Sequence, residues 1–265
     1  VSPVITGVIL TTLTALVILG GIKSIAVTCE KLVPFMAVFY VLGCLVILWI
    51  NRALLPDTIA LIVQSAFSGQ AAVGGFMGAG VREAMRFGIA RGLFSNESGL
   101  GSAPIVAAAA QTKDPVRQAL VSSSGTFWDT VVICLLTGIV VVSSGQWQQG
   151  LNGATLTKSA FETVPYIGHW VLTIGLLTFV YSTILGWEYY GEKAVEYLFG
   201  VKAALPYRIA WVVAVLSGAV VSMPSVWAFA DIANACMAVP NVLSLLLLSG
   251  VIAAETKSYF SAPRG

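Results

Sequence analysis

The sequence predicts an all-α integral membrane protein with about seven membrane-spanning segments, one of them discontinuous. Hydrophobic residues make up 57% of the 265 residues and charged residues only 10%, whereas a soluble domain carries about 25% charged residues. Apolar runs recur along the chain, and one polar, glycine-rich stretch interrupts them. Because a spanning helix needs about 20 mostly apolar residues, the expected surroundings are the lipid bilayer.

Charge and cysteine content limit the partners. The net charge is +2 and no run of Lys or Arg occurs, so nucleic acid is not an expected partner. The four cysteines form neither a CxxC motif nor a cluster with histidine, so neither a zinc site nor a disulfide framework is predicted, and no cofactor is expected. The sequence starts without Met inside an apolar run, so we expect a fragment or a truncated chain.

Two spans are predicted in the first part of the chain, over residues 1–19 and 32–50. Two adjacent glycines and a lysine separate them. Pro34 is expected near the start of the second span, where its missing N–H costs little.

A connection over residues 54–80 follows. Its apolar stretch, residues 58–67, is too short to span a membrane, so we expect a surface-lying helix and a glycine-rich loop. The next segment, residues 81–110, carries charged and polar residues that no uniform lipid-facing helix would have.

Four further spans are expected, with a polar loop of residues 143–168 between the first two of them. Pro240 removes a backbone donor within the last span, which predicts a kink there. The spans cover residues 116–142, 170–190, 209–222 and 225–254.

The distribution of Lys and Arg predicts the orientation. More of these residues fall on the side that carries the loop after the first span, and this bias marks the cytoplasmic side. The expected protein is therefore a multi-pass protein of the cell membrane with a cytoplasmic C-terminus.

The stretch from Phe94 to Pro104 is the most informative part of the sequence. Glycine is a poor helix former and Pro104 disfavours helical geometry in the residue before it, so a broken helix is predicted. Lipid cannot satisfy the freed backbone groups, and such breaks line polar cavities and form solute and ion sites in secondary transporters. The alternative is that the glycines only allow close helix packing. The polar and glycine residues are Ser95, Asn96, Glu97, Ser98, Gly99, Gly101 and Ser102.

Two acidic residues are expected at depth in the membrane. Asp129 lies well inside its span and is either part of a structural ion pair, for example with Arg91, or a functional carboxylate. Glu97 is expected to hold the broken helix by accepting backbone N–H bonds. No role is assigned to three further polar residues, which are Asp231, Asn234 and His169.

Residues 88–104, which read GIARGLFSNESGLGSAP, resemble the signature of the alanine/glycine:cation symporter family. The first motif is long and specific, and the resemblance extends over nearly the whole chain. Further segments that are similar to this family are residues 20–26, 30–34, 129–130 and 181–190.

The resemblance implies a leucine-transporter (LeuT) type fold, a bundle of two inverted five-helix repeats. On this pattern residues 1–53 are the last two helices of the first repeat, and residues 54–80 are an extracellular connection. Residues 81–265 are the second repeat, with its broken helix at residues 81–110. The first three core helices, including the first broken helix, are then missing, and they are partners that complete the binding site.

The resemblance also implies symport of alanine or glycine with sodium as the coupling ion. Substrate-binding residues are then Phe94, Ser95, Asn96, Ser98, Gly99 and Trp187, and sodium ligands are Ser182 and Thr183. From the residues alone, the two hydroxyls could equally bond back to the preceding helical turn. Trp187 could equally be an interfacial anchor.

Three other functions are alternatives to this symport: transport of another solute or with another ion, a channel, and an intramembrane enzyme. A different small solute or proton coupling on the same fold is the serious competitor. A channel fits less well, because a single site-like break and a single aromatic wall suit an occluded site. An intramembrane enzyme would draw on Ser95, Ser98, Asp129 and His169, but neither GxSxG nor HExxH is present, so no catalytic activity is expected.

Overall fold

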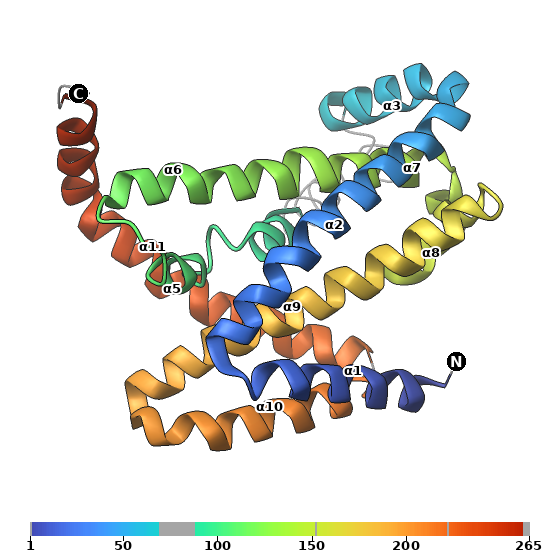
Figure 1. Cartoon of the computed structure of the whole chain (residues 1–265). Helices are drawn as coiled ribbons and strands as arrows, with labels where there is room; N and C mark the ends of the chain where they lie inside the picture. Colours follow the sequence, from blue (N-terminus) through green and yellow to red (C-terminus); the bar gives the residue numbers. More distant parts are fainter. Residues whose placement is uncertain (1, 69–87, 152, 222, 262–265) are drawn as a thin grey trace. The chain divides into compact units, whose positions relative to one another are not determined.

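The structure is a computed structural model that describes residues 2–68, 88–151, 153–221 and 223–261, and all of its regular elements in these ranges are helical (Figure 1). Residues 69–80 of the expected connection and residues 81–87 of the expected broken segment lie outside the described ranges. The labelled helices are α1 (Pro3–Ile18), α2 (Gly21–Ile50), η1 (Arg52–Leu54), α3 (Leu55–Ser68), α5 (Ala103–Ala107), α6 (Pro115–Thr126), η3 (Phe127–Cys134), α7 (Leu135–Ser143), η4 (Gln146–Gln149), α8 (Gly153–Glu162), α9 (Ile167–Phe199), η5 (Val201–Ala203), α10 (Ala204–Gly218) and α11 (Met223–Ser261).

Five helical stretches in the described residues are long and apolar enough to cross a membrane. Helix α1 is apolar but shorter, with 16 residues, and the third expected segment is interrupted. The number of crossings expected from the sequence therefore stays a prediction. The five stretches are Gly21–Ile50, Pro115–Ser143, Ile167–Phe199, Val201–Gly218 and Ser225–Ser261.

The chain forms two compact units, and each is described by itself. Unit 1 contains residues 1–83 and 131–220, and unit 2 contains residues 84–130 and 221–265. The boundary at residues 130 and 131 falls inside η3, a π-helical stretch that continues from α6 into α7. Such stretches replace i→i+4 hydrogen bonds with i→i+5 bonds and are frequent at functional sites.

Unit 1 is built on the long pair α2 and α9, with α1 and α10 side by side next to it (Figure 1). Its core is apolar and aromatic: Tyr40 stacks on Phe161 at 6.0 Å and meets Phe179 edge-on at 5.2 Å. Helices α2 and α9 approach closely at Gly175, where an added Cβ would lie 2.7 Å from the Tyr40 ring. A small residue at this point lets the two backbones come together.

Two expectations for unit 1 were wrong in detail. Helix α2 starts at Gly21, so Pro34 is inside the helix and not near its start; neighbouring groups in a bundle can compensate for the bond it removes. The expected polar loop 143–168 contains the helix α8. Its residue Phe161 is fully buried. This mostly polar segment therefore contributes an apolar side chain to the core.

The predicted bounds of the later spans are too narrow at their polar ends. Helices α9 and α11 run beyond the expected residues 190 and 254, because charged residues at membrane edges continue a helix that apolar content alone would end. The stretch 58–67 is helical as expected, within α3.

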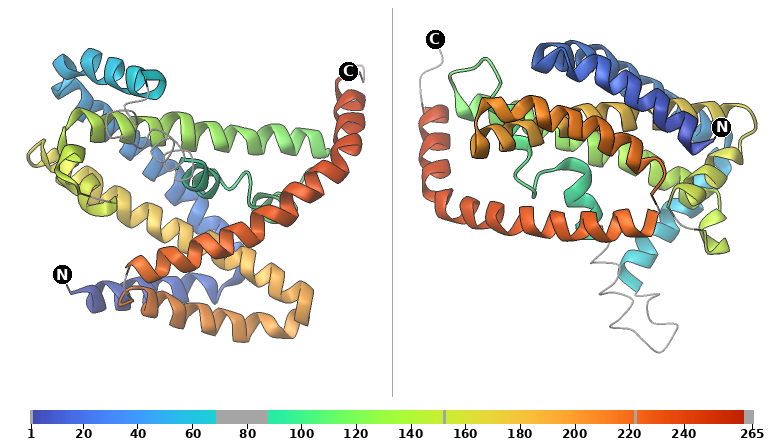
Figure 2. Two further views of the ribbon diagram at one scale, coloured as in Figure 1. Left: turned by 180° about the vertical axis from the view of Figure 1, so that it is seen from behind. Right: turned by 90° about the horizontal axis from the view of Figure 1, so that it is seen from below.

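Unit 2 contains the helical segment 88–96, the short helix α5, helix α6 with the first part of η3, and α11. Helix α11 continues through Pro240 without an interruption of its helical assignment. Its axis changes direction toward the C-terminal, red end (Figure 2). A kink located at Pro240 itself stays a prediction.

Candidate functional site around the interrupted helix

The helical segment 88–96 ends at Asn96, and helical geometry resumes only at Ala103, where α5 begins. Between them Glu97 and Gly101 have positive φ angles of 57° and 81°. A positive φ is uncommon for a side chain such as that of Glu97 and stores strain. The interruption expected within this stretch is therefore present, over residues 97–102.

Hydrogen bonds within the interruption hold it in shape. The Ser102 hydroxyl donates to Glu97 Oε2 at 2.9 Å, and the Ser98 N–H donates to Asn96 Oδ1 at 3.1 Å. The backbone N–H of Leu100 donates to the Glu97 carbonyl at 3.2 Å. The Ser102 hydroxyl in this bond is buried, and the expected acceptance of backbone N–H bonds by Glu97 stays a prediction.

Three side-chain hydrogen bonds join residues 95–98, at the start of the interruption and just before it, to α6 and η3. The Ser95 hydroxyl donates to Asp129 Oδ2 at 2.7 Å. Asn96 Nδ2 donates to Thr130 Oγ1 at 3.0 Å, and the hydroxyls of Ser98 and Thr126 lie 2.9 Å apart. Thr126 lies three residues before Asp129 and four before Thr130, so the partners form one polar face on α6 and the start of η3.

Helix α11 supplies an ion pair and an aromatic ring. Arg91 donates to both carboxylate oxygens of Asp231, at 2.9 and 3.3 Å, and its guanidinium lies 4.2 Å from the centre of the Trp227 ring. Phe94 meets the same ring edge-on at 6.4 Å. The expected pairing of Asp129 with Arg91 was wrong, because Asp231, which had no assigned role, is the residue that binds this arginine.

Asn241 of α11 also binds the interruption. Its Nδ2 donates to the Gly99 carbonyl at 3.0 Å, so it satisfies a backbone acceptor that the break leaves without a helical donor. Its side chain also packs against Gly101, where an added Cβ would lie 3.1 Å from Asn241 Oδ1. Gly101 therefore provides both a positive φ and the room for this amide.

The arrangement places hydroxyl, amide and carboxylate groups next to unwound backbone. Ser95 and Ser98 are exposed within unit 2, and Asp129 is half-buried beside Ser95. Hydroxyls and amides can both donate and accept, and the Asp129 carboxylate can only accept when ionised. Such a set suits a small ligand that carries both a positive and a negative group.

The other predicted site residues lie in unit 1, on α9. The Ser182 hydroxyl donates to the Phe179 carbonyl at 3.0 Å, which is the bond to the preceding turn, and also contacts Met36 Sδ at 3.5 Å. Thr183 is exposed within the chain. Trp187 meets Tyr190 edge-on at 5.7 Å. These residues and those around the interruption fall in different units, so each set is described separately.

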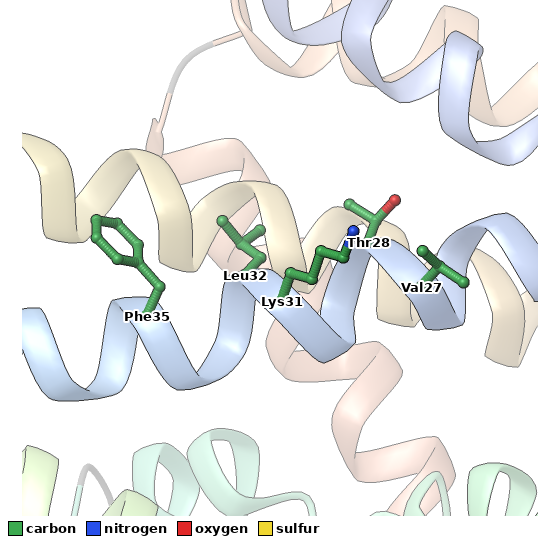
Figure 3. Close-up of a pocket in the computed structure, with 5 residues that line it drawn as sticks. All are labelled: Val27, Thr28, Lys31, Leu32 and Phe35. Carbon is green, nitrogen blue, oxygen red and sulfur yellow. The ribbon is translucent and has the colours of Figure 1, made fainter.

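A shallow recess lies on α2 in unit 1 (Figure 3). Apolar side chains form most of its lining, and Lys31 is its charged group. The Thr28 hydroxyl there is already bonded to the Ser24 carbonyl at 2.8 Å. No residue of this recess was predicted to bind a ligand. Its labelled residues are Val27, Thr28, Lys31, Leu32 and Phe35.

Sequence reasoning missed four partners of the interruption, although the sequence contains signals for them. Thr130 follows Asp129 directly, and Thr126 lies one turn before Thr130, so a polar face could be traced on the fourth span. Asn241 follows Pro240 within an apolar run. Asp231 is an acid inside a span, and such acids have partners as a rule.

Comparison with known proteins gives a family match. Residues 1–264 match the model of the sodium:alanine symporter family. A sodium/alanine symporter, AgcS, of Methanococcus maripaludis is 50% identical over 263 residues, which are 98% of this chain and 57% of that protein. An uncharacterized transporter of Haemophilus influenzae is also 50% identical, over 97% of this chain and 57% of its own length.

A more distant relative carries a different substrate in its name. The probable sodium/glutamine symporter GlnT of Bacillus subtilis is 35% identical over 258 residues, 96% of this chain and 53% of that protein. The chain thus spans little more than half the length of these relatives.

Proposed function

The chain belongs to the sodium:alanine symporter family, and we propose that the full-length protein is a sodium-coupled symporter of small neutral amino acids, alanine or glycine. The family is one of multi-pass membrane transporters and not of enzymes.

The interruption at residues 97–102 is the observation that carries the proposal. It leaves backbone groups without helical partners and surrounds them with Ser95, Asn96 and Ser98. A neutral amino acid has a carboxylate that needs donors and an ammonium group that needs acceptors. Unwound helix at membrane depth supplies both kinds of group.

We assign roles to the site residues on chemical grounds. Ser95, Asn96 and Ser98 hydrogen-bond the amino acid, and Gly99 lets the unwound backbone approach it. Asp129 is a polar core residue that orients Ser95 through their 2.7 Å hydrogen bond. Phe94 is proposed as a further residue that contacts the amino acid. Trp187 is proposed to limit the substrate to small side chains.

The coupling ion is proposed to bind at Ser182 and Thr183. Hydroxyl oxygens suit a hard cation such as sodium. Ser182 donates its proton to the Phe179 carbonyl, but the oxygen keeps lone pairs that can ligate an ion. The ligands that complete the sphere would come from the part of the full-length protein that this chain does not include.

The proposed architecture is the LeuT-type inverted repeat. Residues 1–53 would close the first repeat, residues 54–80 connect the repeats outside the cell, and residues 81–265 form the second repeat. The remainder of the full-length protein would then be the partner that supplies the first broken helix. The excess of Lys and Arg on one side of the cell membrane supports a cytoplasmic C-terminus.

Uptake into proteoliposomes tests the function. The full-length protein should accumulate labelled alanine when sodium is higher outside, and unlabelled glycine should compete. Accumulation driven equally by a proton gradient without sodium would contradict sodium coupling. Preferred accumulation of glutamine would favour the alternative of another small solute, which the named activity of the Bacillus subtilis relative suggests.

A substitution in α9 tests the ion site. Thr183→Ala removes one oxygen ligand and should raise the sodium concentration for half-maximal transport about tenfold or more, the equivalent of about 1.4 kcal/mol in ion binding. Thr178→Ala is the matched control, because the Thr178 hydroxyl is bonded to the Ile174 carbonyl at 2.8 Å. Equal sodium activation of both variants and wild type would disprove the assignment.

A further inference from the structure

The ends of four helices meet at one end of unit 1. Helix α1 turns into α2 there, and α9 turns into α10 (Figure 1). Gly21, with a φ of 70°, begins α2 and faces the guanidinium of Arg208 in α10, so that an added Cβ would lie 3.5 Å from its Nη2. Arg208 thus lies between the α1–α2 turn and α9.

Arg208 is engaged by one carboxylate. Its Nη2 donates to Glu192 Oε1 at 2.9 Å and its Nε donates to Glu192 Oε2. This two-pronged geometry fixes the guanidinium on one partner and neutralises its charge. On the same helix, Lys193 donates to Glu196, so this second cation is also paired.

Glu188 lies one helical turn before Glu192 on α9 and is fully buried, with 0% of its surface exposed. Among the described residues no donor binds either of its carboxylate oxygens, and the acidic side chain next to it is that of Glu192. A buried ionised carboxylate without its own partner costs several kcal/mol, and a bound proton removes this cost.

The two cations whose charge reaches Glu188 are Arg208 and Lys193, and each is paired with another carboxylate. Helix α1 has no ionisable side chain. From α10 the neutral Tyr207 approaches α9 so closely that its hydroxyl lies 1.8 Å from where a Cβ on Gly191 would be. The two lysines at this end are exposed, namely Lys23 in the first turn of α2 and Lys202 in η5.

We propose that Glu188 is a proton-binding site, neutral while the four helix ends are packed and Arg208 is held by Glu192. The ligand is a single proton, which converts the carboxylate to a carboxylic acid. Release of the proton requires either exposure of Glu188 or transfer of Arg208 from Glu192 to Glu188. Glu188 follows Trp187 directly in the sequence, but the proposal does not depend on the assignment of the amino-acid and sodium sites.

Infrared spectroscopy of the purified full-length protein at neutral pH tests the proposal through the C=O stretching band of a protonated carboxylic acid. The wild type should show this band, and Glu188→Gln should lower its intensity by the contribution of one carboxylic acid. Glu196→Gln is the matched control and should keep it. Glu192→Gln should lose it, because Arg208 is then free to pair with Glu188 and stabilise the ionised form.

Two results would overturn the proposal. One is an unchanged band in Glu188→Gln, which would show that Glu188 is ionised in the wild type. The other is a band that appears only after sodium is removed, which would show a metal-cation site in place of a proton site. Glu188→Asp retains an acid and should keep the band. This variant is the control for a loss of the band in Glu188→Gln that comes from loss of the fold.

Thermal unfolding supplies a readout that is independent of transport. The folded protein would hold a proton that the unfolded chain has lost above the ordinary glutamate range, so raising the pH must destabilise the folded state. Between about pH 5 and pH 8, the melting temperature of the wild type should fall more than that of Glu188→Gln. Identical slopes would contradict the proposal even if alanine transport is confirmed.

Discussion

Unit 1 and unit 2 bury their side chains to different extents. Of the described residues that are buried, unit 2 contributes Leu100 and Ser102, and the others lie in unit 1. Unit 1 joins helix to helix through aromatic and apolar packing around Phe161. Unit 2 instead ties an unwound segment to α6, η3 and α11 through polar side chains. Packing secures regular helices, whereas unwound backbone needs individual hydrogen-bond partners.

The largest effect is expected from a deletion in the core of unit 1. Phe161→Ala removes a fully buried ring that stacks on Tyr40 and should lower the free energy of unfolding by about 3–5 kcal/mol. Unfolding of the full-length protein in detergent measures this. Phe199→Ala is the control, because Phe199 is 74% exposed; comparable losses in both variants would show that unit 1 is not held by this core.

A backbone position in unit 2 should give the next largest effect. Gly101→Ala places a side chain at a φ of 81° and 3.1 Å from Asn241 Oδ1, which should destabilise the protein by about 1–3 kcal/mol. Gly125→Ala is the same change in α6 at a position with open space around it. It should be neutral or stabilising, and a Gly101 variant that melts at the wild-type temperature would contradict the positive-φ geometry.

Removing one polar partner of the unwound segment should cost about 1–2 kcal/mol. Asn241→Leu takes away the donor to the Gly99 carbonyl and leaves that acceptor without a replacement. Chemical denaturation checks the size of the loss. Because the carbonyl belongs to the proposed substrate site, alanine uptake should fall further than the amount of folded protein does, and a proportional fall would limit Asn241 to a structural role.

The smallest effect is expected where unit 1 loses a hydrogen bond. Tyr40→Phe removes the 2.8 Å bond between Tyr40 and Thr137, but the Thr137 hydroxyl keeps its 2.7 Å bond to the Ile133 carbonyl. No acceptor is left unsatisfied, so the loss should be about 0.5–1 kcal/mol. A loss as large as that of Asn241→Leu would erase the distinction between the two units.

The sequence predicted the features that depend on local composition. Long apolar runs predicted the helices, and glycine with Pro104 predicted an interruption that is found over residues 97–102. The helix bounds were less accurate, because residues such as those between Gly21 and Pro34 are helical without being uniformly apolar. Helix α8 was not predicted, because its residues are also helical without being uniformly apolar.

The partners of the interruption could not be predicted from local composition. Arg91 and Asp231 are 140 residues apart in the chain, and Asn241 and Gly99 are 142 apart. Such pairings depend on which helices are neighbours, which no local pattern specifies. Asp129 shows the limit clearly: its depth indicated a partner, but several polar side chains were available and only the fold selects Ser95.

Pro34 within α2 has a consequence for how this helix meets its surroundings. An α-helix would direct the N–H of residue 34 to the carbonyl of Glu30, and proline has no N–H to give. That carbonyl is an acceptor in the stretch of α2 that also lines the recess, since Glu30 lies between Thr28 and Lys31 in the sequence. At this one turn, helix α2 therefore offers a backbone acceptor to a water molecule or a lipid hydroxyl. Elsewhere in the interior of the helix the backbone carbonyls are used by helical hydrogen bonds, so side chains alone meet the bilayer.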